Sequence, residues 1–144
     1  RDGIVPNAAC EATIATTIET ARAAVATHIH ELELTEALDA AWLVVRDLNR
    51  FVEEQAPWTL AKDPTRATEL DGVLYTLADG TRAAAILLAA VLPDSAPRIL
   101  TALGAPDDVA WKHAAPNLLP AGVAVAPAGP LFPRIEEPLG GDVV

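Results

Sequence analysis

Apolar residues recur every three or four positions in residues 34–52, and this spacing constrains the fold most. The gaps are 4, 3, 4, 3 and 4 residues, at Leu34, Leu38, Ala41, Val45, Leu48 and Val52. Such spacing puts apolar side chains along one face of a helix, and other helices must cover that face. Thr35 is the expected N-cap. The helix should stop at Ala56, because Pro57 pushes the residue before it out of helical geometry.

Three further segments carry helical patterns. In the first, from Asn7 as expected N-cap to His30, the apolar positions are Ile14, Ile18, Ala21, Val25 and Leu32. In the next, which Asp63 and Pro64 should start, they are Leu70, Leu74, Leu77, Thr81, Ala84, Leu88 and Val91. Pro93 should end that helix, and its glycines, Gly72 and Gly80, would let a neighbouring helix approach closely. A short helix over residues 94–103 should end at Gly104.

The pattern changes at Ala105. Seven of the 12 prolines lie in residues 105–144, where no helical stripe occurs. Val123 and Val125 alternate with alanines and predict one short strand. The sequence therefore predicts an all-α fold, an antiparallel helical bundle over residues 1–104. Residues 105–144 should form an extended Pro-rich C-terminal arm that packs on the bundle or on another domain.

Composition excludes several classes of function. The chain carries 20 acidic and 10 basic residues, a net charge of −10. Non-specific binding to a phosphate backbone needs many lysines and arginines, so we expect no DNA partner. The composition does not exclude a small stacking contact with RNA. The longest uncharged apolar stretch has ten residues, residues 83–92, too few for a bilayer, and we expect no membrane partner. The chain starts at Arg1 without any methionine, so we expect a piece of a longer polypeptide.

Candidates for catalysis and metal binding are few. His28 and His30 are two residues apart and fall on different helix faces, and the zinc motif H-E-x-x-H is absent. Cys10 is expected to be a small buried residue. We therefore expect no catalytic residue, no metal and no cofactor within these 144 residues.

Trp58 directly follows Pro57 at a helix-end corner. Its indole either plugs the end of the bundle or stands out as a flat platform. A platform is what single-stranded bases need for stacking. The polar residues expected near it are Asn49, Arg50, Arg46 and Lys62, whereas Trp42 is expected to be packed.

This corner resembles a known family. Residues 49–63 read N-R-F-V-E-E-Q-A-P-W-T-L-A-K-D and resemble the anticodon-binding domain of methionyl-tRNA synthetases. Two more stretches agree in the family's order: Leu74-Tyr75 with residues 85–88, and the tail of residues 118–122 and 130–135.

The resemblance implies a bundle of the class I synthetase anticodon-binding type, attached to a catalytic domain of the same cytoplasmic chain that uses ATP and Mg²⁺. It implies binding of the CAU anticodon loop of tRNA(Met). Trp58 would stack on a base, Pro57 would set the approach, and Asn49 and Arg50 would border the pocket. Arg46 and Lys62 would contact the RNA backbone.

The family's catalytic motifs, H-I-G-H and K-M-S-K-S, are absent, so this piece alone should not be an enzyme. The alternative is a structural or protein-interaction module that does not bind RNA. Exposure of Trp58 discriminates the two.

Overall fold

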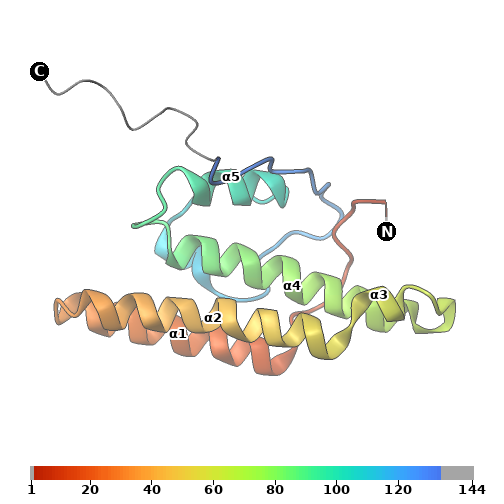
Figure 1. Cartoon of the computed structure of the whole chain (residues 1–144), viewed down its shortest axis with the longest axis horizontal. Coiled ribbons are helices and arrows are strands. Elements are labelled where there is room, and N and C mark those ends of the chain that lie inside the picture. The colour runs from red at the N-terminus through yellow and green to blue at the C-terminus, as the bar shows by residue number, and fades with distance from the viewer. Residues whose placement is uncertain (1, 134–144) are drawn as a thin grey trace, which may run out of the picture.

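A computed structural model describes residues 2–133 of the chain. It contains five α-helices and two short 3₁₀-helices within those residues: α1 (Ala12–His30), α2 (Leu34–Gln55), α3 (Pro57–Leu60), η1 (Pro64–Arg66), α4 (Ala67–Leu87), α5 (Ser95–Ala102) and η2 (Trp111–Ala114). Helices α1 and α2 form an antiparallel hairpin, α4 lies against this hairpin, and α5 packs on the far side of α4 (Figure 1). The all-helical prediction is confirmed. No helix of the described part is long and apolar enough to cross a membrane.

The stripe predicted on α1 is confirmed, whereas the one on α2 is partly wrong. Ile14, Ile18, Ala21 and Val25 are all buried, but Leu32 lies beyond the helix and is exposed. On α2 the buried residues are Ala37, Ala41, Val44, Leu48 and Phe51. Leu34 and Leu38, predicted to be buried, are 62% and 41% exposed. Ala41 and Leu48 are thus buried as predicted, whereas Ala37, Val44 and Phe51 replace the other predicted positions.

The stripe predicted in the segment of α4 is also partly wrong, although Ala84 and Leu88 are buried as predicted. Leu70, Leu74 and Leu77 are only half-buried, and Thr81 is exposed. The face that meets α2 contains Gly80, where an added Cβ would come within 2.6 Å of Leu48 Cδ2. The predicted close approach is confirmed at Gly80, but no atom lies within 4 Å of a Cβ built at Gly72.

Helix ends show which capping predictions hold. Glu11, not Asn7, caps α1, because its carboxylate accepts the backbone N–H groups of Thr13 and Ile14. Thr35 lies inside α2, which has no side-chain cap.

Asp63 accepts the N–H of Thr65 as predicted, although it starts the short η1 and α4 follows. Helix α4 ends at Leu87, six residues before Pro93, and a series of turns fills the gap. Gly104 follows α5 with φ +67, as expected for a helix-ending glycine.

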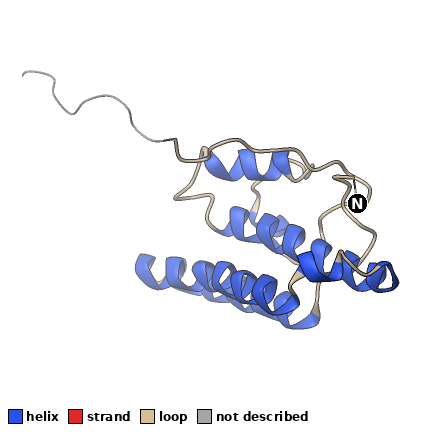
Figure 2. Cartoon of the chain, turned by 45° about the vertical axis from the view of Figure 1, so that its right-hand side comes forward, coloured by secondary structure: helices blue, strands red, loops and turns tan. Residues whose placement is uncertain are grey.

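The arm runs back along the bundle as loops around η2 (Figure 2). The predicted strand is reduced to an isolated antiparallel bridge between Ile4 and Ala124. Val5 donates its N–H to the Val123 carbonyl at 2.9 Å, so the arm pairs with the N-terminal segment rather than with a sheet. The part of the predicted arm from residue 134 to residue 144 lies outside the described residues.

Candidate functional site

The corner between α2 and α3 is a sharp left-handed turn. Ala56 has φ 43° and ψ 61°, which a residue with a Cβ adopts at a cost of roughly 1–2 kcal/mol. Two hydrogen bonds hold it: the Ala56 N–H donates to the Val52 carbonyl at 3.1 Å, and the Thr59 N–H donates to the Ala56 carbonyl at 2.7 Å. Pro57 begins α3, where its missing N–H costs nothing. The corner therefore changes the direction of the chain within one residue.

Leu60 and Trp58 lie on opposite sides of α3. Leu60 is 2% exposed and belongs to the hydrophobic core, whereas Trp58 is 58% exposed. Leu60 therefore fills the place in the core that the indole would take as a plug. Trp58 instead presents an accessible aromatic face. The expectation that Trp42 is packed is wrong, because this side chain is 49% exposed.

Asn49 and Arg50 lie on different flanks of α2, because successive helical residues are rotated by about 100°. Arg50 contacts Asp47 (Nη2 to Oδ1, 3.1 Å) and Glu54 (Nε to Oε1, 3.8 Å). It lines a cleft of about 210 Å³ together with the start of α1, and Trp58 is not among the residues that line this cleft. The structure therefore directs Arg50 toward α1.

The remaining predicted site residues are accessible. Asn49, Arg46 and Lys62 are exposed, and Pro57 is half-buried. No ion pair found in residues 2–133 engages Arg46 or Lys62. Both cations are thus available on the outside of the bundle. Near the corner, hydrogen bonds from Thr65 lower the pKa of Asp63, so this carboxylate stays charged as the cap of η1.

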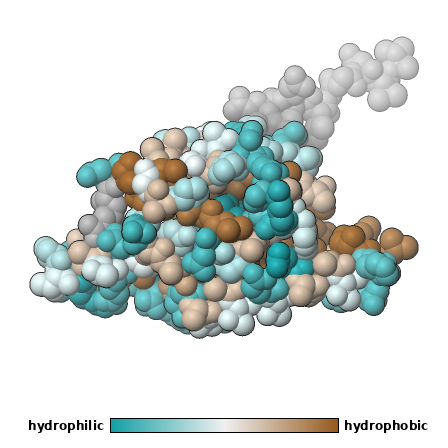
Figure 3. Space-filling model, turned by 180° about the vertical axis from the view of Figure 1, so that it is seen from behind, coloured by the Kyte–Doolittle hydropathy of each residue, from teal (hydrophilic) through white to brown (hydrophobic). Residues whose placement is uncertain are grey.

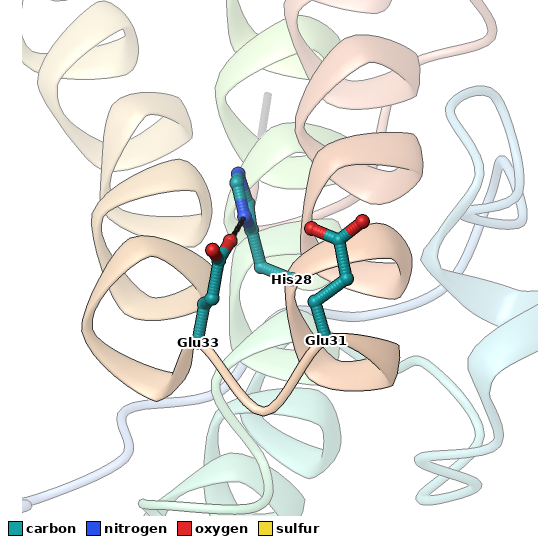
Figure 4. A group of neighbouring side chains, drawn as sticks. All are labelled: His28, Glu31 and Glu33. Carbon is teal, nitrogen blue, oxygen red and sulfur yellow. Dashed lines mark hydrogen bonds and ion pairs between the residues drawn. The ribbon is translucent and has the colours of Figure 1, made fainter.

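One group of side chains has the donors for a metal ion. The ligand atoms of His28, Glu31 and Glu33 lie within 4.8 Å of one another at the turn between α1 and α2 (Figure 4). His28 Nδ1 is 2.7 Å from Glu33 Oε2, and both glutamates are exposed. This hydrogen bond explains why His28 and Glu33 approach each other, and exposed acidic groups such as Glu31 commonly gather without an ion, so we assign no metal to them. The spacing of His28 and His30 gave no signal of this group.

Sequence reasoning missed two residues that position the arm. Asp79 and Arg82 are buried on α4 and contact residues 113–119 of the arm. A signal was present: they are the only charged residues between Asp71 and Asp94. An acid and a base three residues apart in an otherwise apolar helix indicate a buried pair.

Known proteins resemble the chain over most of its length. Residues 5–139 match the family described as the anticodon binding domain of methionyl tRNA ligase. Methionine–tRNA ligase of Deinococcus radiodurans is 44% identical over 108 residues, which are 75% of this chain and 16% of that protein. The Bacillus subtilis enzyme is 34% identical over 110 residues, covering 75% of this chain and 17% of that protein.

Solved structures agree. The free-state structure of Mycobacterium tuberculosis methionyl-tRNA synthetase superposes with a TM-score of 0.79 at 31% identity, over 95% of this chain and 29% of that chain. The chain thus spans about one sixth of the length of these curated relatives. Sequence and fold agree that this chain belongs to the family of anticodon-binding domains of methionyl-tRNA ligases.

Proposed function

We propose that this chain selects tRNA(Met) by binding its CAU anticodon loop, with Trp58 as the stacking face. The observation that carries the proposal is the 58% exposure of this indole beside a fully buried Leu60. Leu60 anchors α3 in the core, so the backbone that carries Trp58 is already in place before RNA arrives, and binding orders only the side chain. Stacking supplies about 1–3 kcal/mol per base and tolerates a net charge of −10.

Polar neighbours would add specificity. The exposed amide of Asn49 offers both donors and an acceptor to a base edge. Pro57 sets the direction of the approach, and Arg46 and Lys62 supply positive charge for the RNA backbone. Arg50 borders the pocket in this proposal, and to touch RNA it must exchange Asp47 or Glu54 for a phosphate or a base.

We further propose that the chain is one domain of a longer cytoplasmic methionine–tRNA ligase. Relatives with that name are about six times longer than the matched region, and a related Mycobacterium tuberculosis enzyme was solved bound by methionyl-adenylate. ATP and Mg²⁺ would then bind the catalytic domain of the same polypeptide, where methionine is joined to tRNA. This domain contributes recognition of the tRNA.

The test uses Trp58 as its own reporter. In a Trp42→Phe, Trp111→Phe background only Trp58 fluoresces, and its emission is titrated with a CAU anticodon stem-loop and with a scrambled loop at low salt. We expect quenching by the CAU loop alone. Trp58→Ala in the natural background should weaken binding, measured with a labelled stem-loop, by about ten-fold or more, because a stacked base is lost.

The alternative function is a structural or protein-interaction module that does not bind RNA. Its best support is Arg50, because Asp47 and Glu54 already neutralise the charge of this side chain. A structural module without RNA binding would show equal, weak quenching by both loops, in this chain and in the intact polypeptide. That result would overturn the proposed function.

A further inference from the structure

An exposed apolar surface lies at the end of the molecule opposite Trp58. The α1–α2 hairpin extends past the end of α4 (Figure 1), and apolar surface gathers at its protruding end (Figure 3). We call this surface the hairpin-end patch. Its side chains are between 41% and 83% exposed: Ile29, Leu32, Leu34, Leu38 and Trp42.

The patch continues the apolar stripes of α1 and α2 beyond the end of α4, the helix that packs on this hairpin. Ile29 follows buried Val25 by four residues on α1. Leu34, Leu38 and Trp42 are spaced by four residues on α2 and form one strip. Isolated surface leucines are ordinary, but a contiguous group of large apolar side chains marks an interaction surface. Much of the surface of these side chains is left uncovered by residues 2–133.

Charge around the patch defines the chemistry of that segment. Acidic residues surround it, all of them exposed: Glu31, Glu33, Glu36 and Asp39. No lysine or arginine occurs between Arg22 and Arg46. A complementary surface therefore has an apolar centre flanked by lysine or arginine. A second copy of this chain is disfavoured, because its acidic residues would face these acidic residues.

We propose that the hairpin-end patch docks an apolar, lysine- or arginine-flanked surface of the same longer polypeptide. The inference rests on the proposed function, which makes this chain one domain of a larger ligase. About five-sixths of each curated relative lies outside the matched region, so a covalently linked partner is available. Trp42 lies roughly 20 Å along α2 from the Ala56 corner, so docking leaves Trp58 open for RNA.

The experiment compares side-chain oxidation in the isolated chain and in the intact polypeptide by hydroxyl-radical footprinting with mass spectrometry. Trp42 reports on the patch, and Trp58 is the internal control, without RNA. We expect several-fold slower oxidation of Trp42 in the intact polypeptide and an unchanged rate at Trp58. Equal Trp42 rates in both proteins would overturn the proposal.

Two variants test the apolar and charged parts. Leu38→Glu in the intact polypeptide should return Trp42 oxidation to the rate of the isolated chain. Phe132→Glu, at an apolar residue elsewhere that is even more exposed, should not. Circular dichroism checks that both remain helical. High salt should also raise Trp42 oxidation, and a rate unaffected by salt would overturn the assignment of a basic partner surface.

The outcomes separate this proposal from the proposed function. Trp42 protection without binding of the CAU loop would refute anticodon recognition and leave the docking surface standing. Binding of the CAU loop without Trp42 protection would refute the docking surface and leave anticodon recognition standing. Protection that grows with the concentration of the isolated chain would identify a second copy as the occupant and overturn the proposal.

Discussion

Asp79 and Arg82 form an ion pair inside the protein. The distance between Arg82 Nη2 and Asp79 Oδ1 is 2.8 Å, and the side chains of Arg82 and Asp79 are 3% and 0% exposed. Asp79 also accepts the backbone N–H groups of residues 117–119, and Arg82 donates to the carbonyls of His113 and Ala115. One pair of charges thus fastens the arm to α4, and each charge is satisfied by backbone as well as by its partner.

Removing one of these charges should be costly. Asp79→Asn leaves Arg82 buried without a counter-ion and turns an amide toward backbone N–H groups, so we expect a loss of about 3–5 kcal/mol of unfolding free energy. Urea denaturation measures it, with the exposed Asp39→Asn as the matched control. A loss below about 1 kcal/mol would show that the pair adds little beyond its hydrogen bonds.

The α3 corner should respond asymmetrically to truncation. Leu60→Ala leaves a cavity in the core and should lower stability by about 2–5 kcal/mol. Trp58→Ala removes an exposed side chain and should change stability by about 0.5 kcal/mol or less. Thermal or urea unfolding of both variants tests this. Equal losses would mean that the indole packs, contrary to its role as a platform.

Two substitutions test where α1 begins. Glu11→Ala removes the acceptor for the N–H groups of Thr13 and Ile14 and should lower stability by roughly 1 kcal/mol. Asn7→Ala, at the cap that the sequence suggested, should have no measurable effect on the urea midpoint. The opposite ranking would place the start of the helix at Asn7.

Cys10 should be inert in the folded protein. Burial, followed by the negative charges of Asp79 and Glu11, raises the pKa of its thiol from 9.0 to about 12. At pH 8 a thiol reagent should react with it only after unfolding in urea.

The same shift predicts a pH dependence of stability. The unfolded chain loses the thiol proton near pH 9 while the folded chain keeps it, so stability should fall as pH rises from 9 toward 12. Cys10→Ser removes the group and should flatten this fall. An identical pH profile for both proteins would contradict the assignment.

Local patterns in the sequence determined much of this protein. The periodicity of apolar residues predicted the long helices and the buried stripe of α1, and capping signals predicted the Asp63 cap and the end of α5 at Gly104. These features depend on residues within a turn or two of each other, and their energetics are therefore present in the chain before it folds. The stretch around Pro57 and Trp58 likewise identified the family.

The tertiary structure decided which faces are buried. Helix α4 has apolar residues on more than one face, so its periodicity allowed several rotations, and the contact of Gly80 with Leu48 selected one. Likewise, the sequence left open whether the Trp58 indole plugs the end of the bundle or stands out, and the rotation of α3 buries Leu60 and leaves Trp58 exposed. Rotation about a helix axis changes no local hydrogen bond; only packing against neighbouring elements distinguishes one orientation from another.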